Sequence, residues 1–213
     1  MWLGLCAAPA TASIIWSGTI EQQLGVGPVS YTYPLDINDD GVDDFIFNHY
    51  SQQLFFDPID GNAGITHQIA DGNYYHDDYV TLSAGILVGS NPEDLSHYWW
   101  GGEDMLVGYM WFYYGLDFKG SFVNTTGYLG LSFDIEGETH YGWLRLSHDL
   151  DAPNGGYLHL TVHDWAWETE PNTPIVAGAV PEPASVVLAL LGAMSVWILR
   201  RCQQQKLNDD GEK

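Results

Sequence analysis

The sequence is poor in cysteine and in basic residues, and each shortage excludes a class of protein. Its 213 residues include two cysteines, Cys6 and Cys202, one near each end, so the long middle of the chain has neither a disulfide nor a reactive thiol. Two basic residues, Lys119 and Arg145, precede Pro183 against 25 acidic ones, which gives that part a formal charge of −23. Such a surface repels phosphate groups, which excludes nucleic acids and anionic membrane surfaces as partners.

The sequence also lacks the common catalytic motifs. It contains no His-Glu-x-x-His, no Gly-x-Ser-x-Gly and no phosphate-cradling glycine loop. Asp134, Glu136 and Glu138 supply paired carboxylates of the kind that glycosidases use. However, Ser132 stands where a jelly-roll glycosidase of the Glu-x-Asp-x-Glu type carries its nucleophilic glutamate. We interpret the three acids as solvated residues beside a turn, and we expect the protein not to be an enzyme.

No window before residue 184 has helical periodicity, whereas alternating apolar and polar residues predict strands. Residues 129–135 and 141–147 alternate with period two around a turn at 136–138, which predicts a hairpin. Apolar residues stand at even-numbered positions up to Val162 but at odd-numbered positions from Trp165. This change predicts a β-bulge near His163 and Asp164. Further strands are predicted at 14–20, 29–33, 45–49, 79–88, 106–112 and 118–123.

Glycine, asparagine, aspartate and proline separate these strands at intervals typical of a sandwich or barrel. We therefore predict an all-β fold, with one antiparallel, jelly-roll-like β-sandwich over residues 13–179. About 168 residues, from Ser13 to Val180, are enough for a domain with its own core. Residues 172–179 are predicted to be a short linker, because proline, glycine and alanine leave little to bury.

The strongest chemical motif lies at residues 36–44, Asp-Ile-Asn-Asp-Asp-Gly-Val-Asp-Asp. Oxygen-bearing side chains at its first, third, fifth and ninth positions, with glycine at the sixth, are typical of a Ca²⁺ site. The predicted ligands are the side chains of Asp36, Asn38, Asp40 and Asp44 and the carbonyl of Val42. The alternative is an Asx-rich turn without metal, although its unneutralised carboxylates would then repel one another.

This loop is similar to the calcium loops between strands in FG-GAP-type proteins, which share the D-x-N-x-D-G-x-x-D spacing. A strand is predicted to follow it, and Phe47 stands where a helical EF-hand carries a glutamate. The resemblance implies a structural calcium ion rather than a regulatory helix pair.

A long apolar run lies near the C-terminal end of the sequence. Its 16 uncharged residues, 184–199, are somewhat fewer than the ~20 that cross a bilayer upright, but flanking residues can snorkel and the bilayer can thin. Apolar side chains on every side favour a transmembrane helix over a buried core helix. Prolines before the run and two arginines after it favour the same interpretation and place the domain outside the cytoplasm.

Together, this run and its flanks resemble the C-terminal sorting signal of the PEP-CTERM family. The matching residues are Pro181, Glu182, Pro183, the run 184–199, Arg200 and Arg201. In that family a membrane-embedded cysteine transpeptidase, an exosortase, reads the signal, and the protein passes from the inner membrane to the cell surface or extracellular matrix of a Gram-negative bacterium. Members usually end at the arginines, whereas this chain continues from Cys202 to Lys213.

Four segments of the predicted β domain also resemble the β-rich bodies of many PEP-CTERM-anchored proteins. They are residues 127–133, 140–146, 160–168 and 175–178. This resemblance implies a class and a location, not a reaction.

The N-terminal residues 1–12 end in the small residues Ala10 and Ala12, which fit the cleavage pattern of a secretory signal peptide. They lack a basic region, so we interpret them as part of a signal that starts upstream; the alternative is a first strand. The expected organisation is a partial signal peptide at 1–12, an outer domain at 13–179, a sorting signal at 180–201 with its helix at 184–199, and a cytoplasmic tail at 202–213.

Aromatic residues gather at 97–102 and 109–114. Exposed tryptophan and tyrosine rings stack on sugars, so Tyr98, Trp99 and Trp100 are candidate glycan-stacking residues, and the alternative is that these rings form core. We expect an exported, acidic, calcium-stabilised protein of the cell surface or extracellular matrix with a structural or adhesive role. A surface-displayed carbohydrate-binding module for extracellular polysaccharide is the alternative, and the sequence does not separate the two.

Overall fold

The computed structural model describes residues 13–25, 30–50, 53–71, 74–91, 97–112, 115–149 and 159–181, with the backbone alone for 69–71, 74–77, 107–112 and 115–119. The chain divides into two compact units, Met1–Val180 and Pro181–Lys213, and the fold below is that of the first. Within the described residues, no helix is long and apolar enough to cross a membrane. The predicted signal peptide, transmembrane helix and tail lie outside these residues.

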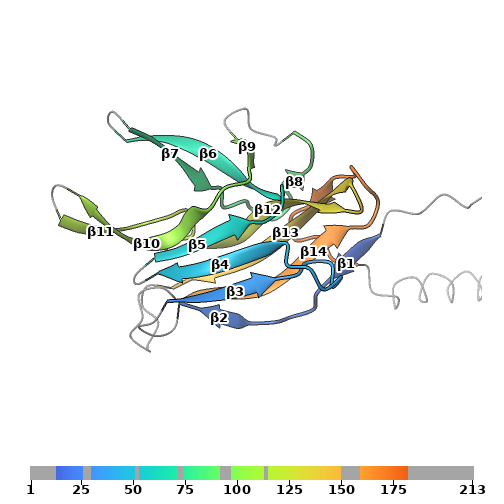
Figure 1. Cartoon of the computed structure of the whole chain (residues 1–213), viewed down its shortest axis with the longest axis horizontal. Helices are drawn as coiled ribbons and strands as arrows, with labels where there is room; N and C mark the ends of the chain where they lie inside the picture. The colour runs from blue at the N-terminus through green and yellow to red at the C-terminus, as the bar shows by residue number, and fades with distance from the viewer. Residues whose placement is uncertain are drawn as a thin grey trace, which may run out of the picture. The chain divides into compact units, whose positions relative to one another are not determined.

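Most of the described residues belong to antiparallel sheets. The larger sheet contains β1 (Ile14–Trp16), β2 (Gln22–Leu24), β6 (Ala63–Asp71), β7 (Tyr74–Tyr79), β9 (His97–Trp100), β12 (Thr126–Ile135), β13 (Glu138–His148) and β14 (Leu160–Glu168). Its order is β1-β14-β13-β12-β6-β7, while β2 also pairs with β14 and β9 with β6 (Figure 1).

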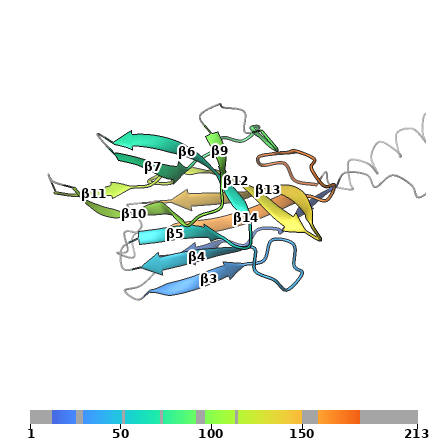
Figure 2. The same ribbon diagram turned by 45° about the horizontal axis from the view of Figure 1, so that its top comes forward.

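The second sheet contains β3 (Tyr31–Leu35), β4 (Phe45–Tyr50), β5 (Gln53–Pro58), β10 (Asp104–Phe112) and β11 (Gly115–Lys119). Its order is β11-β10-β5-β4-β3. Figure 2 shows β3, β4 and β5 lying over the layer formed by β12, β13 and β14. This layering is consistent with a β-sandwich.

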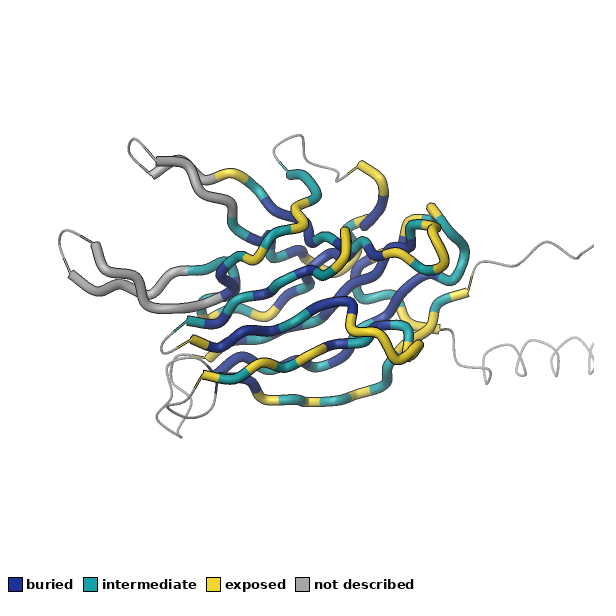
Figure 3. Tube along the Cα trace, viewed as in Figure 1, coloured by how far each residue is buried: buried dark blue, intermediate teal, exposed yellow. Residues whose placement is uncertain are grey.

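One apolar core of buried residues fills the space between these two layers. Figure 3 shows buried segments, in dark blue, along the central strands. Phe45 of β4 stacks on Phe56 of β5 with ring centroids 5.0 Å apart, and it meets Phe133 of β12 at 6.4 Å. Leu144 and Leu146 of β13 also belong to this core. The period-two pattern of the sequence therefore separates the inner face from the outer face as predicted.

Part of the outer face of the larger sheet is also buried, by β8 (Leu87–Val88) and β15 (Ile175–Val176), which form a short ladder. Ile175 and Ala177 are each 2% exposed, and Trp143 of β13 donates its Nε1–H to the carbonyl of Ala179 at 3.2 Å. The prediction of a linker at 172–179 is therefore wrong, because this segment contributes a strand and buried side chains to a second apolar cluster. The members of this outer apolar cluster include Ile65, Val88, Tyr141, Trp143, Ile175 and Ala177.

The predicted hairpin and bulge are both confirmed. Strands β12 and β13 pair from Thr126↔Ser147 to Ile135↔Glu138, and the register of β13 with β14 shifts so that His163 becomes the extra residue. The predicted strand at 79–88 is wrong, because a turn at Ala84 and Gly85 separates β7 from β8. The predicted strand at 118–123 is also wrong beyond Lys119, where a turn follows.

Candidate metal centre

The predicted calcium loop, residues 36–44, joins β3 to β4. Leu35 and Phe45 are direct partners across these strands and are both buried, so the loop leaves and re-enters the core at adjacent points. Ile37 is 4% exposed and belongs to the core, which anchors the loop from within. Gly41 has a φ of +90°, a conformation that side-chain-bearing residues rarely adopt, and this explains the glycine at the sixth position of the motif.

Three predicted ligands are oriented by amides of the same loop. Asp36 accepts hydrogen bonds from the amides of Asp39 at 2.7 Å and Gly41 at 2.8 Å. Asn38 accepts from the amide of Asp40 at 3.0 Å and donates its own Nδ2–H to the Asp40 carboxylate at 3.0 Å. These hydrogen bonds hold the three side chains to their own loop.

Asp44, the fourth predicted side-chain ligand, is buried, with 6% exposure. Its carboxylate accepts from the amide of Ile37 at 2.9 Å and from Asn62 Nδ2 at 3.4 Å. Burial is the largest cause that raises its pKa to about 6; the Ile37 amide opposes the rise, and the charges of Asp36 and Asp40 add to it. The surroundings of Asp44 therefore favour the protonated, neutral form of its carboxyl group.

Asp164 shows the contrasting arrangement. This residue is 5% exposed, about as buried as Asp44, but Arg145 pairs with it in a bidentate manner at 2.9 and 2.8 Å. A protein cation therefore neutralises Asp164. The neighbours that act on the pKa of Asp44 are instead two further carboxylates, together with hydrogen-bond donors.

A cleft of about 500 Å³ adjoins the loop. Its lining collects oxygen-bearing side chains from the loop, from the turn before β6 and from the β12–β13 hairpin: Asp40, Asp43, Asp44, Asp60, Asn62, Ser132, Asp134, Glu136 and Thr139. Asn62 connects these parts, because it donates to the carbonyl of Asp44 at 3.0 Å and accepts from the amide of Asp134 at 3.0 Å.

The donor chemistry of this region fits a hard divalent cation. The predicted ligands present oxygen atoms alone, as Ca²⁺ prefers, and one of them is a buried carboxylate with a raised pKa. Across the part of the chain that the structure describes, no three His, Cys, Asp or Glu side chains already surround a common point as a metal site. Ion binding would therefore have to draw the carboxylates together.

The candidate glycan-stacking rings do not share one face of β9. Tyr98 and Trp100 alternate with Trp99 along the strand, so they point to opposite sides. Trp99 stacks on Tyr141 with ring centroids 5.8 Å apart and donates to the carbonyl of Gly89 at 3.2 Å, which places it in the outer apolar cluster. Trp100, at 38% exposure, is the most accessible of the three.

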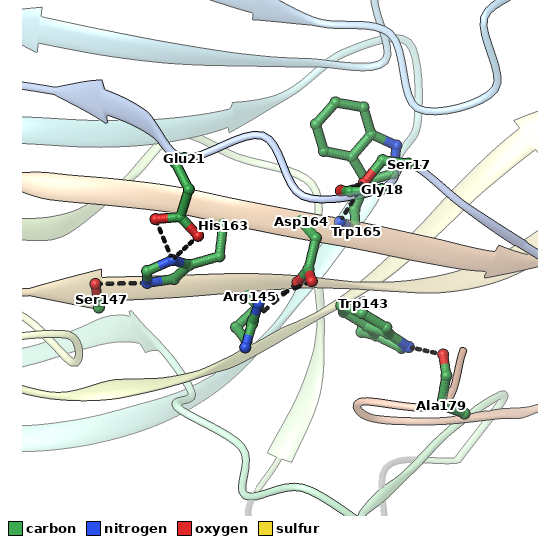
Figure 4. Close-up of polar contacts among 10 residues, drawn as sticks. All are labelled: Ser17, Gly18, Glu21, Trp143, Arg145, Ser147, His163, Asp164, Trp165 and Ala179. Carbon is green, nitrogen blue, oxygen red and sulfur yellow. Dashed lines mark hydrogen bonds and ion pairs between the residues drawn. The ribbon is translucent and has the colours of Figure 1, made fainter. Parts of the chain in front are cut away.

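A polar cluster at the β14 bulge was not predicted from the sequence (Figure 4). The imidazole of His163 lies 2.9 Å from both carboxylate oxygens of Glu21 through Nδ1 and 2.7 Å from the Ser147 hydroxyl through Nε2. This order of contacts also occurs in nucleophilic relays. Here the carbonyl of His163 also accepts from the amide of Ile20 at 2.8 Å, so we interpret the cluster as a tie between the β1–β2 link and the bulge.

Of the predicted sorting-signal residues, Pro181 is described, whereas Glu182, Pro183, Arg200 and Arg201 lie outside the described residues. No protein-family model, curated protein or solved structure matches the chain. The function proposed below therefore depends on the chain's own residues.

Proposed function

We propose that this protein is exported and serves as an acidic, calcium-stabilised component of the cell surface or extracellular matrix, with a structural or adhesive role and no catalytic activity. The calcium ion would be held by Asp36, Asn38, Asp40, Asp44 and the carbonyl of Val42. The observation that carries this proposal is the buried carboxylate of Asp44, whose pKa is raised to about 6 mainly by burial and further by Asp36 and Asp40. A divalent cation among these three carboxylates would offset both causes.

Calcium would act on the stability of the whole sandwich through the position of the loop. The loop joins two paired strands of the second sheet, and Trp165 of the larger sheet donates its indole N–H to the carbonyl of Ile37 at 3.2 Å. An ion that fixes residues 36–44 therefore supports contacts of both sheets. Ca²⁺ is favoured over Mg²⁺ because it accepts irregular oxygen cages with little cost, whereas Mg²⁺ demands near-ideal octahedral geometry.

The first prediction is that the melting temperature of the full chain falls in chelator and recovers in Ca²⁺. Binding to the native state alone stabilises by RT ln(1 + [L]/Kd), about 2.7 kcal/mol at a hundredfold excess over Kd. Asp40→Ala should abolish the response, because it removes a charged ligand at the fifth position of the loop. Scanning calorimetry of both proteins in chelator and in Ca²⁺ measures the effect.

Asp43→Ala is the matched control for this experiment. Asp43 is exposed and lies in the same loop, but it occupies the eighth position, which is not a predicted ligand. It should keep the calcium response while losing the same charge. Identical melting curves of the parent with and without chelator would end the calcium proposal.

The sorting part of the proposal is supported by the C-terminal residues. The division of the chain between Val180 and Pro181 falls next to the predicted start of the signal at residue 180. We propose that a jelly-roll-like domain is followed by a transmembrane helix at 184–199, with Arg200 and Arg201 held in the cytoplasm, since moving each arginine through hydrocarbon costs ~2.5–3.5 kcal/mol. The two prolines keep residues 181–183 extended, which presents Glu182 to an exosortase at the membrane surface.

The second prediction follows from this processing. The precursor should reside in the inner membrane, and the mature surface form should lack residues 202–213. Mass spectrometry of surface-extracted protein tests this; an acid-specific protease suits the digest, because Lys119 and Arg145 are the only tryptic sites before residue 184. Peptides from residues 126–148 serve as the internal control for recovery. If peptides from 202–213 are recovered from the mature surface form, processing is refuted and a plain single-pass anchor remains.

A carbohydrate-binding role is the second candidate, and the exposed ring of Trp100 is the observation that favours it. We place it below the structural role, because Trp99 is engaged with Tyr141 and faces the opposite side of β9 from Trp100. A glycan array probed with the full chain and with Trp100→Ala separates the two roles: binding that is lost in the variant would favour the carbohydrate-binding module.

A further inference from the structure

Two histidines that are far apart in the sequence are direct neighbours on the outer face of the larger sheet. His67 of β6 and His97 of β9 are cross-strand partners, with ring centroids 6.1 Å apart and ring planes inclined by 56°. Asp78 of β7 is the direct partner of His67 on its other side. Residues directly opposite each other in antiparallel strands point to the same face, so the three form a row across adjacent strands.

The imidazole of His67 has an unused nitrogen. Its Nδ1 atom is buried and has no hydrogen-bond partner. A buried polar atom without a partner costs free energy, and a bond to a metal would remove that cost. His97 and Asp78 are both half-buried.

We propose that His67 and His97, with Asp78 as a third donor, bind one divalent cation of the Zn²⁺, Cu²⁺ and Ni²⁺ class. Imidazole nitrogens suit these borderline metals, whereas Ca²⁺ takes oxygen ligands. The site is therefore distinct from residues 36–44 both in donor chemistry and in place, because that loop joins β3 to β4 of the second sheet.

The spacing of the rings is close to what such a site needs. With each nitrogen about 2.0–2.1 Å from a shared metal, the two ring centroids would lie roughly 5–6 Å apart. The observed 6.1 Å is close to this range, so a metal would need the side chains to turn until both nitrogens face one point. Because the described residues contain no three such groups already converging on one point, the metal must complete the site by this rotation.

A metal bound by His67 and His97 would cross-link β9 to β6. β9 lies off the main strand path of the larger sheet and is held there by its ladder with β6, from Gly64↔Trp100 to His67↔His97. The metal would sit at the last pair of that ladder, where it would oppose fraying of β9 from its His97 end. Hydrogen exchange of the β9 amides should therefore slow when the metal binds.

The test uses isothermal titration of Zn²⁺ into the full chain at about pH 7.5, where imidazole is largely neutral. Cys6 and Cys202 are replaced by serine to remove thiolate ligands, and millimolar Ca²⁺ is present to occupy the carboxylates of the acidic surface. We expect one strong equivalent of Zn²⁺, weakened at least about tenfold by His67→Gln and by His97→Gln, since even outer-shell partners of a metal cost about 10–100-fold.

His163→Gln is the matched control, because that histidine is engaged with Glu21 and Ser147 and should leave zinc binding unchanged. Melting temperatures in chelator establish that each variant is folded, and slower hydrogen exchange in β9 on adding Zn²⁺ should be lost in both glutamine variants. The proposal is overturned if the titration shows no strong equivalent, if that equivalent survives both substitutions, or if His163→Gln weakens it as much as they do.

Discussion

Replacing Trp143 by alanine should lower the free energy of unfolding by about 3–5 kcal/mol. Trp143 is 1% exposed and belongs to the outer apolar cluster, edge-on to Tyr128 with ring centroids 5.2 Å apart. The substitution creates a large cavity and removes the hydrogen bond to the carbonyl of Ala179. Both changes would weaken the packing of residues 175–179, which precede the proposed sorting signal.

Urea denaturation measures the stability loss, and hydrogen exchange locates it. The amide of Ala177 donates to the carbonyl of Ile86 at 2.8 Å, and this amide should exchange much faster in the variant because Trp143 no longer covers β15. Trp143→Phe should cost less than alanine, since it keeps a ring but not the donor.

Trp16→Ala is the control for residue type. Trp16 belongs to β1 and is 40% exposed, so its loss should change stability by no more than about 1 kcal/mol. Equal losses for Trp16→Ala and Trp143→Ala would contradict the view that residues 172–179 are an integral layer of the domain.

The strands that could be predicted are those with one buried and one exposed face, because apolar and polar residues then alternate along the sequence. Leu129, Leu131 and Phe133 alternate with smaller or polar residues, and all three lie in the inner core. The β14 bulge was predictable for the same reason. Val162 and Trp165 both belong on the core side but are an odd number of residues apart, so the strand must contain one extra residue between them.

Strand β6 could not be predicted because both of its faces are covered around Ile65 and Thr66. In β6, Ile65 packs in the outer cluster, while Thr66 on the opposite face is fully buried and donates its hydroxyl to the carbonyl of Tyr98. Burial on both sides removes the alternation on which strand prediction depends. The ladder between Ile175 and Val88 was missed for a related reason, since it joins two-residue strands that are far apart in the sequence.

Whether a candidate site could be predicted depends in the same way on how close its residues lie in the sequence. The loop residues Asp36, Asn38 and Asp40 lie within one turn of chain, so their spacing alone could indicate a shared cation. Asn62 joins them only because the chain returns beside Asp44, and no local motif marks that contact. The row of His67, His97 and Asp78 is likewise a product of strand pairing.

Replacing Asp44 by asparagine should change stability in opposite directions with and without Ca²⁺. In chelator near neutral pH we expect the variant to be more stable than the parent by roughly 2 kcal/mol, because it removes a buried charge whose pKa is raised to about 6, mainly by burial. In saturating Ca²⁺ we expect the parent to be the more stable protein, since the variant lacks one charged ligand.

The raised pKa of Asp44 also fixes the direction of the pH dependence in chelator. Between the usual value of 3.8 and about 6, the folded state holds this proton more often than the unfolded chain does. Stability from this group is therefore fully present below the unfolded pKa and is lost as the pH rises through the folded pKa. The parent should lose roughly 2–3 kcal/mol over this interval through Asp44, and near pH 4 the parent and Asp44→Asn should differ by less than about 1 kcal/mol.

Asp43→Asn is the matched control, because it removes the same charge from the exposed neighbour of Asp44. Urea denaturation across this pH range, in chelator and in Ca²⁺, should give Asp43→Asn the same pH dependence as the parent. A chelated Asp44→Asn no more stable than the parent would show that the buried charge carries no penalty. A full calcium response in that variant would remove Asp44 from the ligand set. The expected reversal, by contrast, gives a physical reason for a carboxylate at this buried position, where asparagine would fold more stably in the absence of the ion.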